Sequence, residues 1–190
     1  MRWPLFISAL VASLALAQGA HADNFTIDPN HAQIIFFVKH QGLSTFYGRF
    51  GKVSGTLTFD EAAPEKSTLN VQVDMTNIET HVAELDGELQ NVFQTSKFPT
   101  ASFTTTQVTK TGTNTGTATG NLTLAGVTKP VTLTVTFNGG KRPMLINPYR
   151  VGFDATAVIK RSDFGLTGMI WSGFVSDEVT LMIECEAEKQ

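Results

Sequence analysis

The amino-acid sequence predicts an all-β protein, an eight-stranded antiparallel barrel with one short helical cover segment. Three observations predict it. Apolar and polar residues alternate with a period of two in segment after segment, as in strands with one buried and one wet face. About eight such segments occur, which suits a closed barrel. Hydrophobic residues make up 42% of the 190 residues, enough for one domain with a real core.

The first residues read as a signal peptide that is removed. Arg2 supplies positive charge, residues 5–16 are almost wholly apolar, and Ala22 ends a cleavage site of small residues. The apolar run is too short for a comfortable membrane span. We therefore expect a signal peptide over 1–22 and one barrel domain over 23–190, exported to the periplasm without stable membrane insertion.

Strands follow one another along the mature chain. Glycines and asparagines mark the turns, with a hairpin loop at 111–114 and a strand end at 138–140. The apolar alternation changes phase near Gly51, where we expect a β-bulge that bends the strand. The expected strands are 32–39, 47–60, 69–75, 101–110, 115–124, 131–137, 149–160 and 179–186.

One stretch departs from the β pattern. Between residues 78 and 93, Val82, Leu85 and Leu89 recur at helical spacing. Thr76 and Glu79 fit a capping box, although Thr80 could equally be the N-cap. A single amphipathic helix in an all-β chain is expected to act as a lid or side cover of the barrel.

Segment 34–38 is apolar on both faces of its strand. Its outer face must be covered, either by a helix or by another subunit. We therefore expect a homodimer that associates through residues 32–39 and the helix side.

Composition excludes several functions. A net charge of −3 without a basic run argues against nucleic-acid binding. The lone Cys185 sits among apolar positions and is expected to be a buried small hydrophobe rather than a nucleophile. The mature histidines His31, His40 and His81 form no metal-binding pair on one element, so no metal site and no catalytic residue is expected. The outward strand positions are polar, which argues against an outer-membrane barrel.

The 14 phenylalanines are the unusual feature of the composition. Many of them fall at inward-facing strand positions. An eight-stranded barrel is wide enough either to be filled by side chains or to hold one small ligand. From the periodicity alone, a packed core and a dry lining for an acyl or prenyl chain are equally good readings.

An ordered set of motifs resembles the YceI-like family of exported lipid-binding proteins and covers nearly the whole mature chain. The set opens with Phe25-x-Ile27-Asp28-Pro29-x-His31 and Phe36-x-Val38-x-His40-x-Gly42, and continues with Gly48-x-Phe50, Phe59-Asp60, Ile78-x-Thr80, Asp86-x-x-Leu89, Phe93, and Phe98-Pro99-x-Ala101-x-Phe103. It closes with Gly120-x-Leu122-x-Leu124-x-Gly126-Val127-Thr128, Val131, the sharper signature Arg161-Ser162-Asp163-Phe164-Gly165, and Asp177-Glu178-Val179. The chain departs from the family at Ala32, where serine is usual, and at 91–94, where Asn-Val-Phe-Gln replaces Asp-Phe-Phe-Asp.

The resemblance implies a lipocalin-like barrel with a long apolar channel, often dimeric, for an amphiphile such as an isoprenoid lipid or isoprenoid quinone. No catalytic cofactor is implied. The expected channel residues are Phe36, Val38, Phe50, Leu57, Phe59, Val71, Val73, Leu85, Leu89, Phe93, Phe103, Leu122, Leu133, Phe137, Phe153 and Phe164. The expected polar mouth is formed by His40, Asp86, Arg161 and Asp163.

Two of these mouth residues have an alternative interpretation in which they do not contact a ligand. Arg161 could instead pair with Asp163, Asp86 or Asp177 and stabilise a loop, and His40 could be a plain surface residue. We expect a periplasmic carrier rather than an enzyme. The alternatives are an enzyme or a quinone-linked redox accessory protein, and the sequence does not separate transport from storage or stress protection.

Overall fold

A computed structural model describes residues 22–144, 147–168 and 173–190. Except for Ala22, the expected signal peptide lies outside these residues. The strands are β1 (Asp23–His40), β2 (Ser44–Arg49), β3 (Val53–Phe59), β4 (Thr68–Asp74), β5 (Thr100–Lys110), β6 (Thr115–Leu124), β7 (Val127–Lys141), β8 (Arg150–Lys160) and β9 (Glu178–Lys189). The helices are α1 (Ala83–Val92) and two 3₁₀ turns, η1 (Pro64–Lys66) and η2 (Arg161–Phe164).

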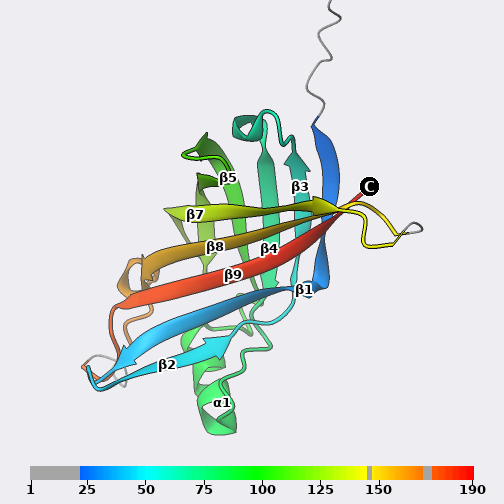
Figure 1. The fold of residues 1–190 in the computed structure, drawn as a ribbon. Helices are drawn as coiled ribbons and strands as arrows, with labels where there is room; N and C mark the ends of the chain where they lie inside the picture. Colours follow the sequence, from blue (N-terminus) through cyan, green and yellow to red (C-terminus); the bar gives the residue numbers. More distant parts are fainter. Residues whose placement is uncertain (1–21, 145–146, 169–172) are drawn as a thin grey trace, which may run out of the picture.

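The strands close into an antiparallel barrel, as predicted. Neighbours pair in the order β1-β3-β4-β5-β6-β7-β8-β9, and β9 returns to pair with β1, so eight strands complete the ring. β2 extends the sheet beside the second half of β1. The β5–β6 hairpin lies at one end of the barrel and α1 at the other (Figure 1).

β1 is longer than predicted and contains a bulge. Its pairing with β9 jumps from Ile27 opposite Ala187 to Ala32 opposite Cys185. At the bulge, the buried Asp28 carboxylate accepts a hydrogen bond from the Asn30 backbone amide, with 2.9 Å between nitrogen and oxygen. Its other oxygen lies 2.7 Å from Nδ1 of the His31 ring. The Asp-Pro-x-His motif therefore shapes the backbone and lets β1 bend around the barrel.

The predicted strand 47–60 is two strands. β2 ends at Arg49 and β3 begins at Val53, so the expected bulge at Gly51 is a complete break. The Gly51 amide donates to the Asp74 carbonyl at 3.1 Å, and a Cβ on Gly51 would lie 2.6 Å from that oxygen. Glycine is needed here because the two backbones approach so closely.

The predicted strand end at 138–140 is wrong. β7 continues to Lys141, and its register with β8 shifts between Phe137 and Gly139. Gly139 has a φ of 107°, a conformation that glycine adopts without strain. The glycine pair therefore accommodates a bulge within a long strand.

The helix is shorter than predicted and its capping box does not form. α1 begins after Val82, which provides no side-chain cap, and Glu79 instead pairs with Arg49. Thr80 fastens the approach to the helix, because its amide and hydroxyl both bind the Asp86 carboxylate. The helix is therefore tied to its preceding loop from inside its first turn.

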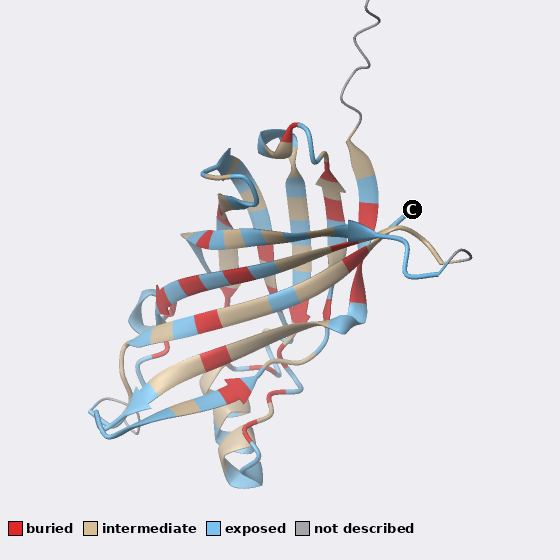
Figure 2. Cartoon of the chain, in the orientation of Figure 1, coloured by how far each residue is buried: buried red, intermediate tan, exposed pale blue. Residues whose placement is uncertain are grey.

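Buried residues are spaced along the strands of the barrel (Figure 2), and in β3 they alternate with less buried positions. They form two clusters, a larger one that includes Phe36, Phe103 and Phe164 and a smaller one around Phe25 and Val151. No helix in the described ranges is long and apolar enough to cross a membrane.

Candidate ligand-binding cavities

The barrel contains two largely apolar cavities, each partly open to solvent. The hairpin-end cavity lies below the β5–β6 hairpin and has a volume of about 170 Å³. The helix-end cavity lies above α1 and has a volume of about 140 Å³. Each is roughly ten times the volume of about 10–15 Å³ that a single water requires.

Three phenylalanine rings form one apolar part of the wall of the hairpin-end cavity. Phe59, Phe137 and Phe153 pack against one another with ring centroids 5.1–5.2 Å apart. Leu57 and Leu133 complete the apolar surface from β3 and β7. Such a surface offers dispersion contacts and no hydrogen-bonding partner, which suits a hydrocarbon chain.

The helix-end cavity has a second aromatic group. Phe50 packs against Phe36 at 5.1 Å and edge-on against Phe93 at 5.8 Å. Leu85 and Leu89 of α1 also line this cavity, so the helix closes the barrel at this end. Val82, which the helical spacing placed on the same face, is instead exposed.

Most of the expected channel residues line a cavity. Those of the hairpin-end cavity are Leu57, Phe59, Leu133, Phe137 and Phe153. Those of the helix-end cavity are Phe36, Val38, Phe50, Val73, Leu85, Leu89, Phe93 and Leu122. Val71, Phe103 and Phe164 line neither cavity, although Phe103 and Phe164 are buried in the core.

Arg161 borders the helix-end cavity and is held by a loop. Its guanidinium donates to the backbone carbonyls of Leu166, at 2.6 Å, and of Ser176, at 3.2 Å. Asp177 lies nearby, and hydrogen bonds from the Ser162 hydroxyl and amide hold the pKa of Asp177 below its ordinary value. Arg161 therefore fixes the loop that forms one rim of this cavity.

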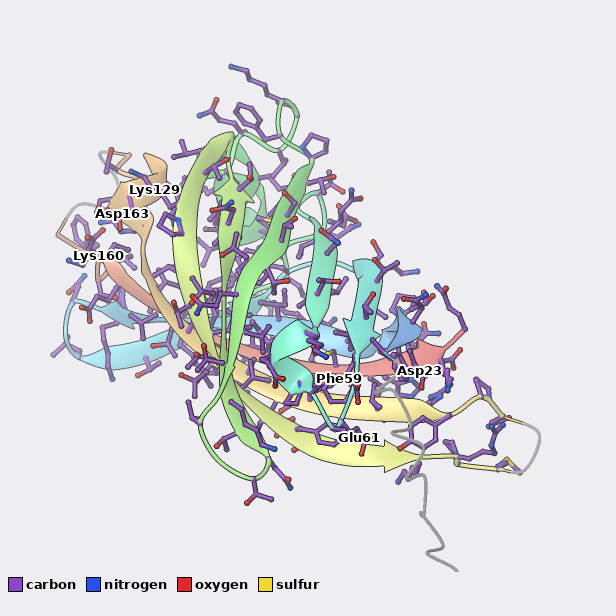
Figure 3. The ribbon with its side chains drawn as sticks, turned by 90° about the horizontal axis from the view of Figure 1, so that it is seen from above. Asp23, Phe59, Glu61, Lys129, Lys160 and Asp163 are labelled. Atoms are coloured by element: carbon purple, nitrogen blue, oxygen red, sulfur yellow. The ribbon has the colours of Figure 1, made fainter. Side chains whose placement is uncertain are left out.

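The other three expected mouth residues do not line either cavity. His40 is exposed at the end of β1, where it forms a β-bridge with Val175. The Asp86 carboxylate accepts hydrogen bonds from the amide and the hydroxyl of Thr80. Asp163 is exposed on the same side of the molecule as Lys160 (Figure 3). The structure thus brings only Arg161 of this set to a cavity wall.

A polar hollow, which the sequence reasoning missed, adjoins the hairpin-end cavity. The two share Phe59 and Glu61, which lie close together in Figure 3. The Tyr149 hydroxyl donates to Glu61 at 3.0 Å, and Arg142 and Lys189 also border the hollow. These residues come from segments far apart in the chain, so sequence spacing carried no signal of the group.

A rim of threonines was also missed. Thr109, Thr113, Thr115 and Thr117 contribute to the wall of the hairpin-end cavity. The many threonines of the sequence predicted exposed strand positions. Because threonine suits either face of a pleated strand, its abundance did not single out the residues that border a cavity. The turn at 111–114, which was correctly placed, was the available signal for this opening.

Cys185 lines the hairpin-end cavity as part of its apolar wall. Burial raises the pKa of its thiol to about 11, and the negative charges of Asp154 and Glu186 add to the effect. A thiol with so high a pKa is protonated at neutral pH and is a poor nucleophile. Among the described residues, no cluster of three or more His, Cys, Asp or Glu side chains could hold a metal ion.

One family model and several known sequences match most of the chain. A family model described as YceI-like domain matches residues 25–187. A UPF0312 protein of Pseudomonas aeruginosa (strain LESB58) is 39% identical over 187 residues, covering 96% of this chain and 95% of the relative. A UPF0312 protein of Photorhabdus laumondii is 40% identical over 184 residues, covering 94% and 93%.

Solved structures share the fold. The Campylobacter jejuni YCEI protein has a TM-score of 0.69 and 32% identity, covering 80% of this chain and 90% of that one. Burkholderia cenocepacia BcnA has a TM-score of 0.76 at 23% identity, covering 84% and 98%. A polyisoprenoid binding domain from Saccharophagus degradans, implicated in plant cell wall breakdown, has a TM-score of 0.63 at 15% identity, covering 87% and 98%.

Proposed function

Because the chain belongs to the YceI-like family, we propose that the protein binds a long-chain amphiphile, an isoprenoid lipid or isoprenoid quinone, inside its barrel. It acts as a carrier in the periplasm, not as an enzyme. The signal peptide read from the sequence supports export. The polyisoprenoid named for the Saccharophagus degradans domain, which has the same fold, supports the ligand class.

The observation that carries this proposal is the pair of apolar cavities. Their walls are built from aromatic and aliphatic side chains of both ends of the barrel, including Phe153 and Phe50. Burying a hydrocarbon chain gains roughly 25 cal/mol for each Å² removed from water. Binding energy therefore comes mainly from the tail, and the polar groups orient the head.

The polar end of the ligand has two candidate positions. Arg161 lies on the rim of the helix-end cavity, where it shapes the loop that a head group would meet. The polar hollow with Glu61, Tyr149 and Lys189 lies beside the hairpin-end cavity. We propose His40, Asp86 and Asp163 only as outer contacts at the helix end, since none of them lines a cavity.

A pair of variants on one strand tests the binding site. Leu133→Trp fills the hairpin-end cavity, whereas Thr134→Trp places the same ring on the exposed outer face of β7. In a competition assay, solanesol displaces a fluorescent fatty-acid probe from the wild-type protein. We expect solanesol to displace less probe from Leu133→Trp, and as much from Thr134→Trp as from wild type. Circular dichroism checks that both variants fold. Equal displacement by both variants, or none by wild type, contradicts the proposal.

We further propose that the protein is a homodimer. An outer patch of Ile35, Phe37, Tyr47, Val158 and Met182 crosses β8, β9, β1 and β2 on the outside of the barrel. Tyr47 is 53% exposed and Val158 60% exposed. α1 lines the helix-end cavity and leaves Tyr47 and Val158 exposed, so the outer face of segment 34–38 still needs a partner.

The charges around the outer patch favour a second copy as that partner. Lys39 and Lys160 flank one end, together with Glu178, and Asp154 and Glu184 flank the other. A twofold axis through the patch brings the basic end of one copy to the acidic end of its partner. We expect a dimer by sedimentation at tens of micromolar, and a monomer for Tyr47→Glu. A wild-type monomer at that concentration contradicts this.

A further inference from the structure

On four strands of the barrel, one inward-facing position lies between a residue that lines the helix-end cavity and a residue that lines the hairpin-end cavity. On β5, Phe103 lies between Ala101, which lines the helix-end cavity, and Thr105, which lines the hairpin-end cavity. On β4, Val71 lies in the same way between Leu69 and Val73. Phe103 and Val71 face each other in the register and line neither cavity.

The same level recurs on two further strands. On β6, Gly120 lies between Ala118 of the hairpin-end cavity and Leu122 of the helix-end cavity. On β8, Ala157 lies between residues 155 and 159, which line the two cavities in the same order. We call Val71, Phe103, Gly120 and Ala157 the dividing layer, and Phe103 has the largest side chain of these four residues.

Phe103 occupies the space that this layer leaves open. Its ring lies against Gly120, where a Cβ would come within 2.6 Å of the ring carbon Cζ. The side chain is 9% exposed and packs in the larger core cluster. The absence of a side chain at Gly120 and the small Ala157 leave the interior at this level to be filled by the Phe103 ring.

We propose that Phe103 sets the length of chain that the barrel accepts. This inference rests on the proposed function and names the residue that decides its substrate class. A short prenyl chain occupies one cavity and leaves the ring in place. A long chain that occupies both cavities has to pass the dividing layer, and therefore has to displace the ring from its seat on Gly120.

Chain-length preference in variants tests this inference. Dissociation constants are measured for the short prenol farnesol and the long prenol solanesol. Phe103→Ala is expected to raise the affinity for solanesol relative to farnesol by about tenfold, which corresponds to about 1.4 kcal/mol. Phe103→Leu keeps more of the buried volume and is expected to show a smaller change in the same direction, and it serves as the test if the alanine variant does not fold.

Thr104→Ala is the matched control. It shortens an exposed side chain on the outer face of the same strand, so the affinities for both prenols, and their ratio, are expected to match those of wild type. An unchanged solanesol-to-farnesol ratio in the folded Phe103 variants overturns the inference. If wild type binds neither prenol, the proposed function fails instead, so the two failures are distinguishable.

Discussion

Asp28 shows how a single buried charge fixes the strand that closes the barrel. Its carboxylate contacts His31 and lies 3.4 Å from the Arg150 guanidinium on β8. Burial acts to raise the pKa of Asp28, but the hydrogen bonds from His31 and the Asn30 amide, with the nearby positive charges, bring it below its ordinary value. The folded state therefore favours the ionised carboxylate.

Replacing this charge is expected to destabilise the protein. Asp28→Asn removes the buried negative charge beside Arg150. This change should lower the free energy of unfolding by about 1–3 kcal/mol at pH 7. A lowered folded-state pKa stabilises the native protein above the unfolded-state pKa, and that contribution is lost as the pH falls through the folded value. The difference between wild type and variant should therefore shrink below about pH 4. Urea unfolding at pH 7 and pH 3 measures it, and a difference that grows in acid contradicts this.

Cys185 reports on the hairpin-end cavity at the same scale. Its thiol has a pKa of about 11, chiefly because it is buried. Since the thiolate is the reactive form, alkylation by iodoacetamide should accelerate about tenfold for each pH unit between 7 and 10. A ligand in the hairpin-end cavity should slow the reaction at every pH. A rate that levels off near pH 8, or one that ligand does not change, is inconsistent with this environment.

At the scale of elements, α1 is stabilised by the packing of its apolar face more than by the intrinsic helix propensity of its residues. It contains Gly87, begins without a side-chain cap, and has no fully buried residue. Leu85 and Leu89 contact the helix-end cavity. Most helical stability in proteins comes from such packing rather than from propensity.

Truncating that face should loosen the cover of the cavity. Leu89→Ala is expected to lower the free energy of unfolding by about 1–2 kcal/mol, less than a fully buried leucine would cost. It should also speed release of bound ligand, because the helix closes this end of the barrel. Glu88→Ala, on the exposed side of the same helix, is the control. Equal release rates from the two variants, followed by stopped-flow fluorescence, count against a covering role.

The boundaries of elements show where sequence reasoning reached its limit. The alternation placed Leu69, Val71 and Val73 on the correct face of a strand, because inward direction follows from the period of two. The bulge at 28–31 was not foreseen, because the period of two does not show where a strand bends. The folded chain holds it by hydrogen bonds to Asp28 from Asn30 and His31, and Asp28 also lies beside Arg150 of a distant strand. Tertiary contacts of this kind leave little trace in a local pattern.

For the whole molecule, closure of the ring and its apolar interior were both predictable. The division of that interior was not. Periodicity shows that Phe103 points inward, but whether its ring lines a channel or divides two cavities depends on Gly120 of the next strand. The polar hollow around Glu61 and Tyr149 likewise combines segments that only the folded barrel brings together.

The most direct test of the central claim is the mass of the native protein. The protein is expressed from its full sequence, purified without detergent, measured by native mass spectrometry, and extracted with organic solvent. We expect one long-chain isoprenoid lipid or quinone for each barrel, released by the solvent, because the interior offers apolar surface from both ends. A purely apo mass, together with no uptake of added prenols, quinones or fatty acids, would contradict the account.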